Sequence, residues 1–103
     1  MMIDKNGYSE SLLNTEEDVC YLCKKHTKTA RHEIFGASNR SFSKKLGLWI
    51  NVCPGCHSSI HLNPLDYIPL KEEGQRAFER EYGHARFVAV FSRNYLEEEE
   101  WTD

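Results

Sequence analysis

The sequence predicts a small α+β domain in which a cysteine knuckle and two strands precede a set of helices. Two observations support this fold class. All four cysteines occur in two Cys-x-x-Cys pairs, Cys20/Cys23 and Cys53/Cys56. Two short segments between the pairs are typical of strands, whereas the residues after the second pair have helical periodicity. At 103 residues, the chain forms one domain with a hydrophobic core near the lower limit for independent stability.

The knuckle and the strands come first along the chain. Residues 20–23 form a tight turn that points both thiols the same way. Residues 31–35 form a first short strand. Residues 36–47 are rich in Ser, Asn and Lys, which predicts a polar loop that ends at a glycine. Residues 48–52 are β-branched and aromatic, so we expect a second strand there.

Three helices are predicted after the second cysteine pair. The first spans residues 54–62 and begins with a proline, which suits the first turn of a helix. The second spans residues 70–82, which contain strong helix formers and are followed by a glycine. The third spans residues 84–93 and carries Phe87, Val88 and Phe91 on its predicted buried side.

The two ends of the chain are predicted to lie outside a single domain of residues 19–96. Residues 1–18 have little periodicity and predict an acidic arm that is flexible or loosely docked. Residues 97–103 begin with four glutamates and predict a solvated acidic tail. The polar, acidic start differs from a secretory signal, and no apolar run approaches the roughly 18 residues of a membrane span. We therefore expect a cytoplasmic protein with no membrane partner.

The cysteine pairs predict a structural zinc site. Two pairs separated by 29 residues fit one tetrahedral ion held between a knuckle and the start of a helix. Disulfides are disfavoured in the cytoplasm. A thioredoxin-like redox role fits less well, because two pairs would be redundant and neither lies in a βαβ pattern. We expect one structural Zn²⁺ bound by Cys20, Cys23, Cys53 and Cys56, with its binding energy stabilising the fold.

Charge is strongly segregated along the chain, although the net charge is only −3. Residues 1–20 have a net charge of −4 and residues 62–103 of −5, whereas residues 21–61 have +6. The positive segment contains seven basic side chains, Lys24, Lys25, Lys28, Arg31, Arg40, Lys44 and Lys45. This segment favours contact with nucleic-acid phosphates, although uneven surface charge is also common in small proteins.

Three histidines predict a second metal site. His57 and His61 are four residues apart, so they share one face of the predicted helix, roughly 100° around from Cys56. His32, on the first strand, can supply a third imidazole. Isolated surface histidines are the ordinary alternative. Three protein ligands would leave a coordination position for water or a phosphate oxygen, as in catalytic sites.

The order of these motifs is itself informative. A knuckle, a strand with a histidine, a loop, a second strand and Cys-x-x-Cys-His-x-x-x-His on a helix follow one another over residues 20–61. This pattern resembles the HNH endonucleases and implies their ββα-metal (His-Me finger) fold, which is treble-clef-like. His-Glu-Ile-Phe-Gly, Asn39-Arg40 and Cys-Pro-x-Cys-His are similar to small phage and prophage HNH-type proteins. C-terminal matches extend the resemblance to about Leu96.

The resemblance implies a metal-dependent DNA endonuclease that hydrolyses phosphodiester bonds. A catalytic divalent ion (Mg²⁺, Mn²⁺, Zn²⁺ or Ni²⁺) would be bound by His32, His57 and His61. The seven basic residues would hold the DNA backbone with little sequence discrimination. Asn39 in the predicted loop would orient the catalytic loop, and Asn51 on the second strand is the alternative.

One position departs from the family pattern. The residue after His32 is usually a histidine that deprotonates the attacking water, and here it is Glu33. An ordinary Glu side chain, with a pKa near 4.3, is a weaker base than imidazole. Glu33 could act as the base if desolvation raised its pKa, or it could bind the metal. Alternatively, His32 is the base, or the site binds metal and DNA without cutting.

The sequence leaves three functions open. The first is an HNH-type nuclease of phage or prophage origin. The second is a zinc-stabilised nucleic-acid-binding module with a degenerate HNH site. The third is a module that binds a phage or host protein, which the acidic ends would suit. DNA cleavage would select the first, salt-dependent DNA binding without cleavage the second, and absence of DNA affinity the third.

Overall fold

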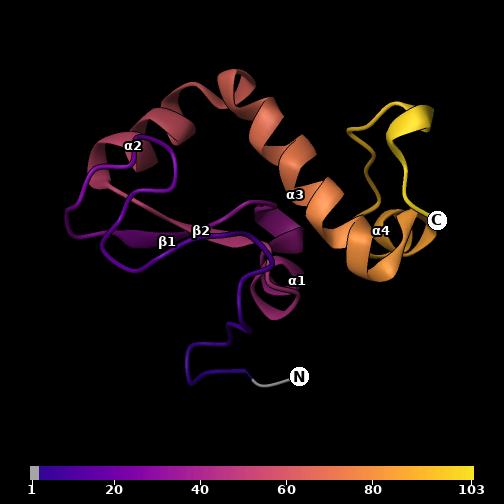
Figure 1. Ribbon diagram of the computed structural model, residues 1–103, viewed down its shortest axis with the longest axis horizontal. Coiled ribbons are helices and arrows are strands. Elements are labelled where there is room, and N and C mark those ends of the chain that lie inside the picture. Colours follow the sequence, from indigo (N-terminus) through magenta and orange to yellow (C-terminus); the bar gives the residue numbers. More distant parts are fainter. Residues whose placement is uncertain (1–2) are drawn as a thin grey trace.

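The chain folds around a two-stranded antiparallel sheet flanked by four α-helices (Figure 1). This computed structural model describes residues 3–103 and has the predicted α+β architecture. The strands are β1 (Ala30–Glu33) and β2 (Trp49–Val52). The helices are α1 (Arg40–Lys45), α2 (Pro54–Leu62), α3 (Ile68–Tyr82) and α4 (His84–Phe91). Short 3₁₀ turns occur at Ala37–Asn39, Pro64–Tyr67 and Glu98–Glu100.

The two strands pair in a register that fixes the functional side chains of β1. His32 lies opposite Ile50, and Glu33 lies opposite Trp49. The amide of Ile34 donates to the carbonyl of Leu48 at 3.0 Å and extends the pairing by one step. Because side chains alternate along a strand, the Cβ atoms of His32 and Glu33 point to opposite faces of the sheet.

The connection between the strands is a helix, where the sequence predicts a loop. Residues 40–45 form α1, and the buried Ser43 anchors it to the sheet. The Ser43 hydroxyl donates to the carbonyl of Leu48 at 2.6 Å and accepts from the amide of Phe35 at 3.2 Å. The loop prediction was wrong because these tertiary hydrogen bonds outweigh the low helix propensity of the serines.

Helix α2 confirms the predicted bounds of residues 54–62. Pro54 occupies the first turn, and Cys53 caps the helix because its sulfur accepts from the amide of Cys56 at 3.4 Å. The same geometry recurs in the knuckle, where the sulfur of Cys20 accepts from the amide of Cys23 at 3.5 Å. Both cysteine pairs are therefore shaped by their own backbone.

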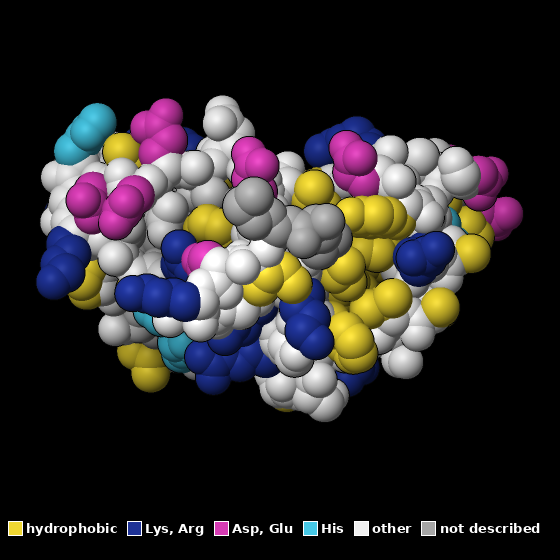
Figure 2. Space-filling view, turned by 90° about the horizontal axis from the view of Figure 1, so that it is seen from below, with side chains coloured by type: hydrophobic (Ala, Val, Ile, Leu, Met, Phe, Trp, Pro, Cys, Tyr) yellow, Lys and Arg dark blue, Asp and Glu magenta, His cyan; other side chains and the backbone are white. Residues whose placement is uncertain are grey.

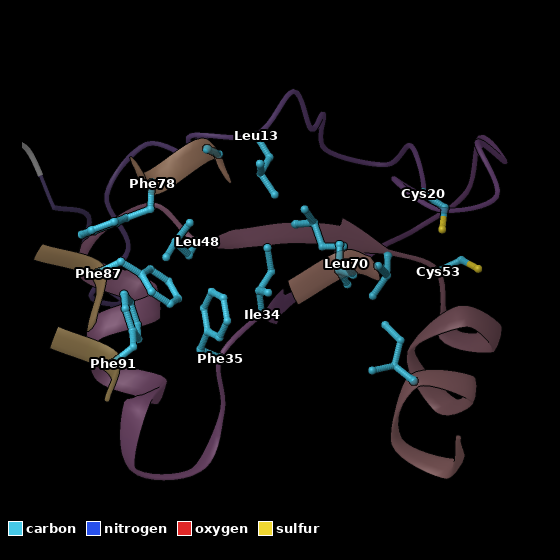
Figure 3. Close-up of a cluster of buried hydrophobic side chains, with 14 residues drawn as sticks. Leu13, Cys20, Ile34, Phe35, Leu48, Cys53, Leu70, Phe78, Phe87 and Phe91 are labelled. Atoms are coloured by element: carbon cyan, nitrogen blue, oxygen red, sulfur yellow. The ribbon is translucent and has the colours of Figure 1, made fainter. Parts of the chain in front are cut away.

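An aromatic core joins the sheet to the C-terminal helices. Figure 3 shows Phe35, Phe87 and Phe91 gathered at one end of the buried cluster, with Cys20 and Cys53 at the other end. The ring centroids of Phe35 lie 5.4 Å from Phe87 and 4.9 Å from Phe91. Such aromatic contacts bury large apolar areas in a small core.

Helix α3 lies between the sheet and α4 (Figure 1). At Gly74 it packs tightly against the two residues that follow β1. A Cβ atom at Gly74 would lie 3.2 Å from a methyl carbon of Ile34 and 3.3 Å from the ring of Phe35.

Helix α3 begins two residues before its predicted start. Helix α4 ends two residues early, because Ser92 adopts a left-handed φ of 56°. Phe87 and Phe91 are buried as predicted, but the prediction for Val88 was wrong, since its side chain is exposed.

The N-terminal segment, for which the sequence predicts a flexible or loosely docked arm, is docked on the sheet. Residues 1–2 of that arm lie outside the described residues. The indole of Trp49 donates to the carbonyl of Ser9 at 2.8 Å, and the Ser11 hydroxyl donates to the carbonyl of Trp49 at 2.7 Å. Gly47, with φ of 76°, allows this contact because a Cβ there would lie 2.5 Å from the carbonyl oxygen of Glu10.

The acidic tail also differs from the expected solvated segment. The Trp101 indole stacks on the His84 ring with centroids 3.7 Å apart. The amide of Thr102 donates to the buried carboxylate of Glu79 at 2.9 Å. These contacts hold residues 97–103 against α3 and α4, so the tail belongs to the folded domain.

Candidate metal centres

The four cysteines form a closed cluster that could hold a metal ion. Their sulfur atoms lie within 4.8 Å of one another. The sulfurs of Cys23 and Cys53 are 3.8 Å apart. Four thiolates about 2.3 Å from a tetrahedral zinc ion are separated by about 3.8 Å, so the donor set fits such an ion. Cys20 is 0% exposed and Cys53 is 7% exposed, whereas Cys56 is half-buried and Cys23 is exposed, so the cluster lies at the edge of the core.

The thiols of this cluster differ in acidity. Burial raises the pKa of a thiol, but at Cys20 backbone hydrogen bonds, led by the one from Cys23, lower the pKa to about 6. Burial and hydrogen bonds with the neighbouring sulfurs raise the pKa of Cys56 to about 12. Because the thiolate is the metal-binding form, the backbone prepares Cys20 as a ligand.

Three histidines form a second cluster. His32 comes from β1, and His57 and His61 come from α2. Their ring nitrogens lie within 4.8 Å of one another. The ring centroid of His32 lies 5.5 Å from that of His57 and 5.9 Å from that of His61. The structure thus brings together the three imidazoles from two elements, and this donor set could also hold an ion.

The environment of this cluster favours neutral imidazoles. Burial and repulsion from His57 and His61 lower the pKa of His32 to about 4. Burial also lowers the pKa of His57. A neutral imidazole nitrogen is the form that binds metal ions.

The histidines open into a cavity of about 520 Å³. Its wall includes three cationic side chains, Arg31, Arg40 and Lys71. Figure 2 shows histidine side chains (cyan) beside Lys and Arg side chains (dark blue) at the lower left of the visible face. A donor cluster open to solvent, with cationic side chains in the cavity wall, suits an anionic ligand.

Glu33 lines the cavity but already accepts two hydrogen bonds. The hydroxyl of Tyr8 donates to one carboxylate oxygen at 2.8 Å, and the guanidinium of Arg40 donates to the other at 2.5 Å. The side chain of Glu33 is 9% exposed, whereas that of Arg40 is 66% exposed. Burial and the hydrogen bond to Glu33 raise the pKa of Tyr8 to about 12, so its hydroxyl remains a donor at neutral pH.

Asn39 is engaged away from the histidines. Its side-chain amide donates to the carbonyl of Phe91 at 3.0 Å, which ties the connection between the strands to the end of α4. Asn51 is buried. Its backbone amide donates to the Thr15 hydroxyl at 2.9 Å, and its backbone carbonyl accepts from the backbone amide of Tyr21. Neither asparagine is among the residues that line the cavity.

The seven predicted basic residues fall into separate groups. Arg31 and Arg40 line the histidine cavity. Lys44 and Lys45 line an adjoining hollow that shares Arg40 with it. Three further lysines belong to the segment around the knuckle, and none of them is in either wall, namely Lys24, Lys25 and Lys28.

Sequence analysis missed two side chains of the site, Tyr8 and Lys71. Tyr8 comes from the segment predicted to be flexible, and no local pattern places it beside Glu33. Lys71 had a usable signal, because it precedes Gln75 and Phe78 by four and seven residues on α3 and therefore shares their inward face. Burial lowers the pKa of Lys71.

Comparison with protein-family models, curated proteins and solved structures finds no match to this chain. Over residues 3–103, no helix combines the length and apolar character that crossing a membrane requires. Function is therefore inferred from the two donor clusters and the cavity.

Proposed function

We propose that this protein is a metal-dependent HNH-type endonuclease that hydrolyses phosphodiester bonds in DNA. The observation that carries the proposal is the convergence of His32, His57 and His61 in an open cavity lined by cationic side chains. The sequence resemblance assigns these same three residues to a catalytic ion. Charge around the cavity supports an anionic substrate such as a nucleic-acid backbone.

In this proposal the cysteine cluster binds a structural zinc ion and completes a treble-clef-like ββα-metal fold. Its four sulfurs leave no position for a substrate, because a Cys₄ site is closed. Cys53 and Cys56 lie in the first turn of α2, and His57 and His61 follow on the same helix. The zinc ion would therefore fix the helix that presents the catalytic ligands.

The histidines would hold a divalent ion next to the scissile phosphate. When bound, such an ion stabilises the negative charge that develops on the phosphate and the leaving oxygen. Glu33 would accept a proton from water while the water oxygen bonds to phosphorus and the P–O3′ bond breaks, leaving the electron pair on O3′. A carboxylate has about four lone-pair positions. Because two are used by Tyr8 and Arg40, the Glu33 carboxylate can still accept from water.

A second candidate function is a nucleic-acid-binding module with this fold that does not cut. The specific observation in its favour is that Tyr8 and Arg40 both occupy Glu33. Each oxygen of this carboxylate already accepts a hydrogen bond from the protein, so water would compete with Tyr8 and Arg40 for Glu33. In this case Glu33 would serve to orient Arg40 toward the backbone.

Nicking of supercoiled plasmid DNA tests the proposal. We expect the wild-type protein to nick with Mg²⁺ or Mn²⁺, and we expect His57→Ala and Glu33→Gln each to lower the rate by about 100-fold or more. His26→Ala is the matched control, because His26 is exposed and lies outside the histidine cluster. It should leave the rate unchanged.

Two outcomes would contradict the nuclease. Equal nicking by wild type and His57→Ala would assign the activity to something other than this cluster. Salt-dependent DNA binding with no nicking in any of Mg²⁺, Mn²⁺, Zn²⁺ or Ni²⁺ would select the binding module instead.

A further inference from the structure

The three cations that line the histidine cavity differ in how their charge is balanced. Arg31 forms an ion pair with Asp4 at 2.8 Å. Arg40 forms an ion pair with Glu33 at 2.5 Å. Within residues 3–103, no carboxylate forms an ion pair with Lys71. Lys71 therefore contributes an uncompensated positive charge to the cavity.

The position of Lys71 is fixed by aromatic rings. Lys71 is half-buried on α3, and its ammonium nitrogen lies 5.8 Å from the ring centroids of both Phe35 and Tyr95. Cation–π contacts at this distance hold an ammonium group without neutralising it, because the rings carry no net charge. Partial burial reduces the hydration of this ammonium group, so an anionic ligand beside it would be favourable.

A phosphate group is the anion that matches these surroundings. We propose that Lys71 binds a non-bridging oxygen of the backbone phosphate that lies at the three histidines, an inference that rests on the proposed nucleic-acid substrate. A lysine ammonium is a compact charge that suits a phosphate oxygen. Lys71 reaches the cavity from α3, outside the strand–strand–helix unit that carries the histidines. The C-terminal helices would then take part in substrate binding as well as in the core.

The salt dependence of binding tests this role without relying on cleavage. The probes are a short fluorescein-labelled DNA duplex and an RNA duplex of the same sequence, with affinity followed by fluorescence anisotropy over a range of KCl concentrations. We expect Lys71→Met to weaken binding about tenfold and to reduce the slope of log K against log [salt] by about 0.9, the value for one lost phosphate contact.

Two further variants and one further measurement complete the design. Lys71→Arg should retain the wild-type slope, because it keeps the charge. Arg80→Met is the matched control, since Arg80 is an exposed cation on the same helix and lies outside the cavity wall. Circular dichroism establishes that each variant is folded. If Lys71→Met does not fold, the comparison of Lys71→Arg with the wild type still tests the inference, because a reduced slope with the charge retained would contradict it.

The outcomes separate this inference from the proposed nuclease. An unchanged slope in folded Lys71→Met, or a loss of binding in Lys71→Arg equal to that in Lys71→Met, overturns the role of Lys71 even if the wild type nicks plasmid. A reduced slope in a protein that never nicks supports the phosphate contact and contradicts the nuclease. A slope change on RNA alone supports Lys71 and contradicts DNA as substrate. No binding to either duplex overturns both proposals.

Discussion

The two donor clusters share one helix but differ in almost every physical respect. The cysteine cluster is at the start of α2, and the histidine cluster uses the following residues of the same helix. Two of the four cysteines, Cys20 and Cys53, are buried, whereas none of the three histidines is buried and all three line an open cavity. Four soft sulfur donors close one site, and three imidazoles leave the other incomplete.

Under the proposed function, this difference would separate stability from chemistry within a very small protein. A closed tetrahedral site converts metal-binding energy into folding energy but offers nothing to a substrate. An open site contributes less to stability and keeps a position for a reacting group. Because α2 carries ligands of both clusters, an ion at the first would also hold the ligands of the second in place.

The largest expected effect is on folding. Apparent binding energies at structural zinc sites are on the order of 10 kcal/mol, similar to the whole stability of a domain. We expect Cys53→Ser to abolish the cooperative thermal transition measured by circular dichroism. His57→Ala should retain that transition and change the free energy of unfolding by no more than about 1 kcal/mol.

This contrast has a clear control and a clear contradiction. Ser58→Ala, between the ligands of α2, should behave as wild type in both metal content and melting. If Cys53→Ser and His57→Ala lowered stability equally, the division between a stabilising cluster and a reactive one would be wrong.

Chelation gives a smaller effect, on activity alone. We expect dialysis against EDTA to remove an exchangeable ion from the histidines and to leave about one zinc per chain at the cysteines, because the buried tetrathiolate site binds more tightly. Plasmid nicking should stop while the circular dichroism spectrum stays unchanged, and added Mg²⁺ or Mn²⁺ should restore it. Metal content measured by atomic absorption would contradict this if zinc and activity were lost together.

The sequence predicted the two clusters well because their ligands follow local rules. The spacing of Cys53, Cys56, His57 and His61 fixes which face of α2 each side chain occupies, and α2 has the predicted bounds. His32 is brought to His57 and His61 by the pairing of β1 with β2, the strand that leads into α2. The donor clusters are thus the part of this fold that can be predicted from the spacing of residues close together in the sequence.

The surroundings of the clusters were harder to predict because they depend on contacts between distant segments. Tyr8 reaches Glu33 across 25 positions, and Arg76 pairs with Glu100 across 24. No periodicity in the acidic ends indicates such contacts, so the N-terminal end was predicted as a flexible or loosely docked arm and the C-terminal end as a solvated tail. Helix α1 was missed for the same reason, since it depends on the buried hydroxyl of Ser43.

The smallest predicted effect concerns the hydrogen bond that the Tyr8 hydroxyl donates to Glu33. Tyr8→Phe removes the hydrogen bond to Glu33 but keeps the ring that packs edge-on against Trp49 and lies 4.3 Å from the Arg31 guanidinium. A hydrogen bond of this kind contributes about 1 kcal/mol, or somewhat more to a charged acceptor. We expect the urea midpoint to fall accordingly and the zinc content to stay at one per chain. Tyr82→Phe, an exposed position whose hydroxyl has no partner among the described residues, should change neither quantity. Loss of zinc in Tyr8→Phe would show that the two clusters are coupled more tightly than their shared helix implies.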